Sequence, residues 1–122
     1  MEEELTIVIP KKNSVVISNN ADTPIGQGSV SNLTGFLENV IIKADNYGIL
    51  NIVTDDGIVI YNGWIEAGVH VFPIRFQAKV NDGDAWFTYN AEKLLLDNNT
   101  INITWEKKES TCEVIFRCQK LS

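Results

Sequence analysis

The chain has little of what most enzymes and nucleic-acid-binding proteins need. Its 122 residues contain one histidine, two cysteines and ten lysine or arginine residues, against sixteen aspartate or glutamate residues. The net charge of -6 repels a phosphate backbone, and the basic residues form no cluster that would release counterions. No apolar run approaches the roughly 18 residues that span a bilayer. We therefore expect neither a nucleic-acid nor a membrane partner.

The acidic start of the chain, MEEELTIVIP, lacks the basic residues with which a secretory signal begins. This predicts synthesis in the cytoplasm. The cysteine content agrees, because Cys112 and Cys118 lie six residues apart in the strand-like run TCEVIFRC. A continuous strand would separate them by roughly 20 Å, too far for a disulfide bond. Two buried free thiols are therefore expected, and no CxxC pair indicates a zinc site.

Catalytic groups are equally scarce. His70 is the single histidine that could act as a general base, and its place in VHVF predicts a side chain that faces solvent or an interface. The carboxylate pairs Asp55–Asp56 and Asp82–Asp84 fall in turn sequences, where aspartate caps the backbone, although a calcium ion at Asp82 and Asp84 is an alternative. Gly26–Gly28 opens no helix that would cradle a phosphate. We expect a non-enzymatic protein with no cofactor and no metal.

What the chain does have is a regular succession of short apolar runs and turns. Between Leu33 and Phe76 the runs are separated by DNYG, DDG and NG, which predicts an antiparallel meander. Towards the end, Ile101–Glu106 and Cys112–Cys118 alternate apolar and polar residues on either side of Lys107–Ser110, the pattern of a hairpin with one buried face. The pattern predicts one all-β domain over residues 1–122, an antiparallel β-sandwich or jelly roll of about eight to nine strands.

Three further segments complete this interpretation. Leu5–Ile9 and Val15–Ser18 are expected to be strands on either side of a turn. Asn19–Asn32, rich in Gly, Ser and Asn, is expected to be the longest loop, and together with residues 1–9 it is a candidate contact arm. Ala91–Asp97 is the only segment of helical composition.

The aromatic residues are the best indication of a binding surface. Five of them lie in or beside predicted turns: Tyr47 and our four candidate interaction residues, Tyr61, Trp64, Trp86 and Tyr89. Aromatic side chains at such places suit sugar stacking or a protein interface. The alternative is that they cap the open ends of a sandwich. By contrast, Trp105 alternates into the core.

Several short elements in the first two thirds of the chain resemble a small β-sandwich module of structural proteins of tailed bacteriophages, which include capsid decoration proteins, head fibres and tail components. The elements are Gly35–Phe36, Gly48–Ile52, Asp56–Gly57, Ala67–Gly68 and Phe72–Phe76. The chain departs from the module after Phe76, since it continues with a further hairpin.

The resemblance implies a non-enzymatic virion structural protein, first of all a capsid decoration or stabilising protein. Such a protein would bind phage capsid or tail proteins, form a homo-oligomer, in particular a homotrimer, and reside in the virion after assembly in the cytoplasm of the bacterial host. The turn aromatics point to an alternative, a carbohydrate- or receptor-binding module of a tail or fibre, which would make a glycan a partner.

Overall fold

The protein is all-β, as the sequence predicts. A computed structural model describes residues 13–79, 86–90 and 93–119, and these form nine strands and no α-helix. The strands are β1 (Ser14–Ser18), β2 (Ile25–Ala44), β3 (Gly48–Thr54), β4 (Val59–Ile65), β5 (Gly68–Pro73), β6 (Arg75–Lys79), β7 (Trp86–Asn90), β8 (Leu94–Glu106) and β9 (Thr111–Gln119). Every pair of neighbouring strands is antiparallel.

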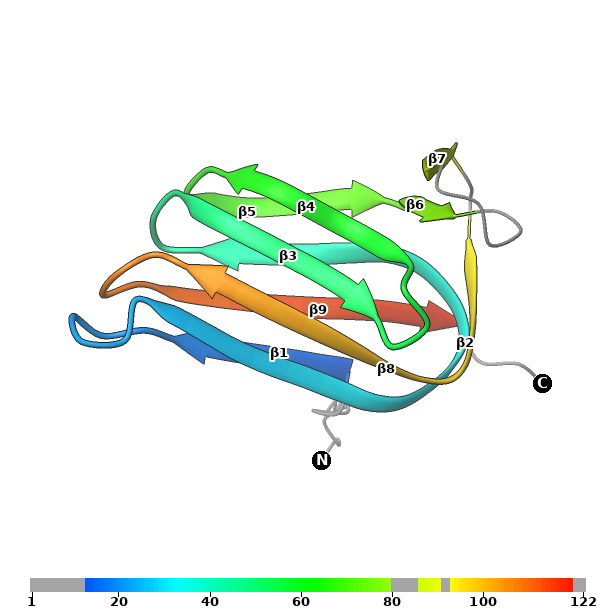
Figure 1. The fold of residues 1–122 in the computed structure, drawn as a ribbon, viewed down its shortest axis with the longest axis horizontal. Helices are drawn as coiled ribbons and strands as arrows, with labels where there is room; N and C mark the ends of the chain where they lie inside the picture. Colours follow the sequence, from blue (N-terminus) through cyan, green and yellow to red (C-terminus); the bar gives the residue numbers. More distant parts are fainter. Residues whose placement is uncertain (1–12, 80–85, 91–92, 120–122) are drawn as a thin grey trace, which may run out of the picture.

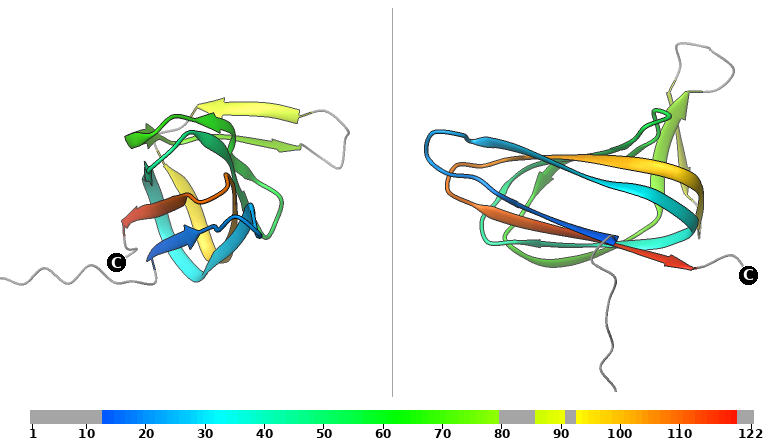
Figure 2. Two further views of the ribbon diagram at one scale, coloured as in Figure 1. Left: turned by 90° about the vertical axis from the view of Figure 1, so that its left-hand side faces the viewer. Right: turned by 90° about the horizontal axis from the view of Figure 1, so that it is seen from below.

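The 20-residue strand β2 organises the sheet. Its first part pairs with β8, whereas its second part pairs with β9 on one edge and β5 on the other. The sheet therefore divides at β2 and curls round the core (Figures 1 and 2). One side consists of β4, β3, β8 and the start of β2, and the other of β5, the end of β2, β9 and β1. Hydrogen bonding is continuous between the two sides, so the finer choice between a sandwich and a jelly roll stays a prediction.

Several connections cross from one side of the curled sheet to the other. The prediction that β8 and β9 form a hairpin is wrong, because the two strands do not pair with each other. β8 pairs with β2 and β3, and β9 pairs with β1 and β2. Alternation identifies which residues are buried but not which strand is the neighbour. The four connections 19–24, 45–47, 66–67 and 107–110 all lie at the left of Figure 1, and we call this the arch end. The turn at Asp55–Gly57 does join a true hairpin, β3 and β4.

The predicted loop Asn19–Asn32 is mostly strand. Only residues 19–24 connect, and β2 begins at Ile25. The glycines that suggested a loop serve close packing instead: a Cβ atom on Gly26 would lie 2.4 Å from Cγ2 of Ile17, and one on Gly28 would lie 2.6 Å from Cγ2 of Val15. Glycine is thus required here because β1 approaches the backbone of β2 from across the core.

Two smaller sequence predictions are also wrong. Asn62–Gly63 is not a turn but the middle of β4, where Gly63 pairs with Leu50. The helical composition of Ala91–Asp97 is overridden by packing from Leu94 onward, since Leu94 and Leu96 are buried in β8. Ala91 and Glu92 lie outside the described residues, as does the predicted strand Leu5–Ile9.

The core contains the side chains that the alternation predicts. Ile101, Ile103 and Trp105 of β8 are at most 2% exposed, and so are the inward side chains of β9, Cys112, Val114 and Phe116. Burying a large apolar side chain contributes about 1.5–3 kcal/mol to stability, so these two strands hold the curled sheet together.

Candidate functional site

Polar side chains bind the connections of the arch end to one another. Nδ2 of Asn19 lies within 3.1 Å of three carbonyl oxygens, those of Pro24, Trp105 and Lys107. One amide group thus joins the connection 19–24 to the end of β8. Because buried carbonyl groups without a partner are costly, this contact fixes how the two connections pack.

Asp45 makes the matching contact between β2 and β9. Its carboxylate accepts hydrogen bonds from Oγ of Ser110 at 2.5 Å and from the backbone N–H of Thr111 at 3.0 Å. The bond from Ser110 is the main reason that the pKa of Asp45 is lowered from its ordinary value of 3.8. Ser110 in turn accepts a hydrogen bond from Nε1 of the buried Trp105 at 3.3 Å.

Trp64 stands on this fixed arch end and is a surface residue. Its side chain is 64% exposed, and its ring centroid lies 5.9 Å from that of Tyr47, which precedes β3. Nζ of Lys107 covers the other ring of the pair, 4.1 Å from the centroid of Tyr47. The indole is therefore exposed at the arch end, beside the 54% exposed side chain of Tyr47, and Trp64 is one of the four candidates selected from the sequence.

Tyr61, the second candidate, has a structural role. Its ring packs against Phe72 at a centroid distance of 5.2 Å, and its hydroxyl donates a hydrogen bond of 2.5 Å to the carbonyl oxygen of Trp64. Burial raises its pKa. Tyr61 thus covers the gap between β4 and β5 and holds the backbone beneath Trp64, which agrees with the capping alternative.

The remaining two candidates lie away from Trp64. Trp86 begins β7, is 51% exposed and borders a hollow with the β3–β4 turn, at the opposite end of β4 from Trp64. The backbone of Tyr89 pairs with Phe76, and its side chain lies outside the described set. The four candidates therefore do not form one site.

A row of uncharged polar side chains, which sequence analysis did not single out, crosses the outer face of β4, β3, β8 and β2. Asn62 lies opposite Asn51, Asn51 opposite Thr104, and Thr104 opposite Gln27. We call these four residues the amide row. The alternation of each strand contains this signal, but the register that aligns the strands comes only from the fold.

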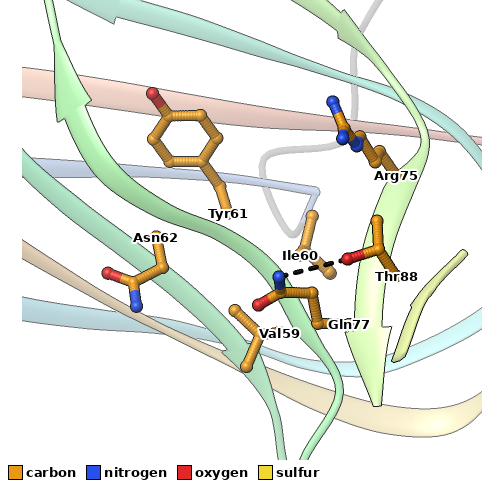
Figure 3. Close-up of a pocket in the computed structure, with 7 residues that line it drawn as sticks. All are labelled: Val59, Ile60, Tyr61, Asn62, Arg75, Gln77 and Thr88. Atoms are coloured by element: carbon orange, nitrogen blue, oxygen red, sulfur yellow. Dashed lines mark hydrogen bonds between the residues drawn. The ribbon is translucent and has the colours of Figure 1, made fainter. Parts of the chain in front are cut away.

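Two shallow hollows accompany the amide row. One of about 250 Å³ lies over β2, β8 and β3 and is lined by Gln27, Asn51 and Thr104. The other, of about 170 Å³, begins at Asn62 and continues between β4 and β6, where Gln77 donates a hydrogen bond of 3.3 Å to Thr88 (Figure 3). The row thus connects two depressions on one face of the molecule.

The outer face of the other side is apolar. In the register, Val71 lies opposite Ile41, which lies opposite Ile115. Val69 and Val16 stand in the adjacent row, with Lys43 and Glu113 between them. We call the five apolar residues the valine face: Val16, Ile41, Val69, Val71 and Ile115. Its three valines are 59–66% exposed, so this face presents apolar side chains to the surface on both sides of the two charged residues.

The prediction that His70 faces outward from β5 is wrong. His70 is not the outward residue of VHVF, because it lies opposite the buried Ile42, stacks on Phe72 at 5.9 Å, and places Nε2 2.8 Å from the carbonyl oxygen of Glu66. The outward residues are Val69 and Val71. The sequence does not reveal which residues of β5 face outward, because apolar residues lie on both of its faces.

The other candidate chemical groups act within the fold. Asp55 accepts a hydrogen bond of 2.7 Å from Asn99, which lowers its pKa, and Asp56 accepts one from Thr54, so both carboxylates serve the β3–β4 turn. Asp82 and Asp84 lie outside the described residues. Among the described side chains, no group of three or more histidine, cysteine, aspartate or glutamate residues is placed to hold a metal ion.

The cysteines are free, as predicted. Cys112 is buried, and Cys118 is half-buried. Burial raises the pKa of Cys112 to about 12 and also raises that of Cys118. Both thiols are therefore protonated at neutral pH and are poor nucleophiles.

No protein-family model, curated protein or solved structure matches this chain. Residues 13–79, 86–90 and 93–119 include no helix with the length and apolar character to cross a membrane. The function must therefore be argued from the two outer faces of the molecule.

Proposed function

We propose that this protein is a non-enzymatic structural component of a phage virion, which binds a capsid or tail lattice and stabilises it. In this proposal the valine face and the edge strand β5 form the contact with neighbouring subunits. The chain acts as a homo-oligomer, in particular a trimer, and joins the virion in the host cytoplasm. The resemblance of residues 35–76 to phage β-sandwich modules supports this assignment.

The observation that carries the proposal is the edge strand β5. Among the described strands, β5 pairs with β2 alone, so its other edge offers unpaired backbone groups. Soluble proteins protect such edges with lysine, bulges or short strands. Here the six residues of β5 read GVHVFP: Pro73 at its end is its one residue of a protective type, no lysine, arginine or carboxylate is present, and Val69 and Val71 are 66% and 61% exposed. An edge of this kind is suited to contact with another protein chain.

The charges beside the patch also suit a protein partner. Lys43 and Glu113 lie opposite each other between Val69 and Val16, and Arg117 lies opposite Asn39 on the far side of the row that contains Ile41. Both signs of charge are thus interspersed among apolar side chains. Charges at the rim set orientation and partner choice, while the apolar centre supplies the affinity.

Co-sedimentation tests this proposal. Purified chain is mixed with phage capsids, and separately with tails, that were assembled without it, and each mixture is pelleted. We expect the chain in the pellet with one of these assemblies, at a saturable stoichiometry. Recovery of the chain in the supernatant in both mixtures would contradict the proposal.

The second candidate is a carbohydrate- or receptor-binding module of a tail or fibre. The specific observation in its favour is that the exposed Trp64 and the amide row share one outer face, because Trp64 follows Asn62 by two residues in β4. Both functions are compatible in one virion protein, since the valine face and the amide row lie on opposite sides of the curled sheet.

A further inference from the structure

We propose that the amide row, with Trp64 at its border, is a binding site for an uncharged oligosaccharide. The inference deepens the second candidate function and rests on it, but it does not depend on lattice binding through the valine face. It assigns residues that the turn aromatics alone did not indicate, namely Gln27, Thr104, Asn51 and Asn62.

Asparagine residues in the amide row occupy strand positions that do not favour asparagine. Asparagine is depleted in β-strands, because its side chain competes for backbone hydrogen bonds and packs poorly on a pleated surface. Asn51 and Asn62 nevertheless lie in the interiors of β3 and β4 and directly opposite each other. Threonine would suit a merely solvated strand face better. The two amides are therefore best explained by a ligand.

The hydrogen-bond donors and acceptors of the four side chains in the amide row are available to a ligand. Gln27 and Asn62 are exposed, and Asn51 and Thr104 are half-buried. No hydrogen bond joins any of the four to another described side chain, in contrast to Asn19 and Asn99. Each amide offers a donor and an acceptor side by side, which can bind two neighbouring hydroxyl groups of a sugar.

The distance between neighbouring strands determines the length of the amide row. Neighbouring strands lie about 4.8 Å apart, so the row places four polar groups along roughly 14 Å. This length accommodates an oligosaccharide of a few rings rather than a single small molecule. One hollow lies over Gln27, Asn51 and Thr104, and Asn62 borders the second hollow, so each end of the row adjoins a shallow depression.

A second row of side chains lies beside the amide row, on the side nearer the arch end. Trp64 lies opposite Ile49, and Ile49 lies opposite Glu106 in β8. A sugar ring is amphipathic: its C–H face packs on an aromatic ring while its hydroxyl groups point sideways. Trp64 and the amide row supply the two complementary surfaces side by side. The aromatic cluster with Tyr47, at 5.9 Å, holds the indole in place.

The charge distribution decides between a sugar and a peptide or nucleic acid. The protein carries a net charge of -6, yet the four residues of the amide row are all uncharged. The charged residues that border the row, Glu106 beside Ile49 and Arg75 at the second hollow, have opposite signs. A charged ligand would be recognised by charged groups, and in particular an anionic one by arginine or lysine. An uncharged polyol is the ligand whose chemistry matches the row.

An array of defined neutral and acidic oligosaccharides tests the proposal, followed by calorimetry with the best neutral oligosaccharide. We expect binding of the wild-type chain to neutral glycans. Asn51→Ala and Trp64→Ala are each expected to weaken it by about tenfold or more, as truncation of a central contact residue does. Gln119→Ala is the matched control, because Gln119 is an exposed amide at the end of β9 on the other side of the sheet.

Circular dichroism and thermal unfolding of each variant show whether the fold is retained. A folded wild-type chain that binds no neutral glycan, or whose binding is unchanged in Asn51→Ala and Trp64→Ala, would overturn the inference. So would binding that is lost in Trp86→Ala alone, because Trp86 lies at the opposite end of β4. None of these outcomes affects co-sedimentation with capsids or tails, which tests the other face separately.

Discussion

The two outer faces of this curled sheet are built from the same long strand, β2, yet they differ in chemistry. The first part of β2 lies under the amide row, which is uncharged and polar. The second part lies under the valine face, where exposed apolar side chains alternate with charged side chains of both signs. One strand can thus contribute to two surfaces, because the register of its partners decides what each surface presents.

This difference suggests a division of labour. Exposed valines beside an unprotected strand edge suit a protein partner, whereas aligned amides beside an indole suit a polyol. The arch end connects the two sides through partly buried polar contacts. The predictions below test whether the two faces are independent and what holds them in register.

The largest effect is expected from charge on the valine face. The double substitution Val69→Lys and Val71→Lys should abolish co-sedimentation with the capsid or tail assembly, because it places two cations in an apolar contact. Stability should change little, since both side chains are already exposed. Pelleting assays and thermal unfolding measure the two quantities.

Leu95→Lys serves as the control for this substitution. Leu95 is an apolar residue of β8 that is 54% exposed but lies outside the valine face. It should leave co-sedimentation intact. Equal loss of binding in the control and in the double variant would remove the special role of the valine face.

The next largest effect is a loss of stability at Gly26, where β1 and β2 pack against each other across the core. Gly26→Ala introduces a Cβ atom that would lie 2.2 Å from Oδ1 of Asn19 and 2.4 Å from Cγ2 of Ile17, so these two side chains must shift. Overpacking of this kind costs about 1–3 kcal/mol of unfolding free energy. Urea unfolding measures the loss. Ser29→Ala, at an exposed position of the same strand, should cost far less, and equal stability of both variants with the wild type would mean that the packing is looser than described.

A smaller loss is expected at the arch end. Asn19→Ala removes the amide that contacts the carbonyl oxygens of Pro24, Trp105 and Lys107. We expect a loss of about 1–2 kcal/mol in unfolding free energy, because partly buried carbonyl groups lose their donor. Asn20→Ala is the matched control, since its side chain caps only exposed backbone groups of the same connection. A control that costs as much as Asn19→Ala would contradict this role.

The smallest effect is a pH dependence at Asp45. The hydrogen bond from Ser110 lowers the folded-state pKa below the ordinary value of 3.8. The stabilisation is therefore fully present above that value and is lost as the pH falls through the lower folded-state pKa. Urea midpoints at pH 7 and pH 3 should show Asp45→Asn less stable than wild type at pH 7, with a smaller difference at pH 3. A difference that does not depend on pH would rule out the carboxylate as its source.

The sequence was sufficient for the composition of the core but not for its topology. Alternation at Ile101–Trp105 and at Cys112–Phe116 correctly predicted the buried side chains, because burial acts on each strand separately. Neither the crossing of β8 to β9 nor the strand conformation of Ile25–Asn32 was predicted. In the second case Gly26 and Gly28 were taken as signs of a loop, although they mark a close approach between strands.

The candidate site was predicted only in part. Trp64 was selected because it follows Asn62–Gly63, a predicted turn that is the middle of β4 in the structure. The amide row was missed, since its four members are far apart in the chain and become a row only through the register of four strands. The valine face was missed for a related reason: both faces of β5 are apolar, so the pattern VHVF does not reveal which residues are buried.

The most direct test of the central claim, that the valine face and the edge of β5 form the contact with the virion lattice, is backbone hydrogen exchange in the free and lattice-bound chain. The account predicts that the amides of β5 exchange more slowly in the bound state, while those beneath the amide row, in β3 and β4, exchange at unchanged rates. Protection in β3 and β4 with none in β5 would contradict it.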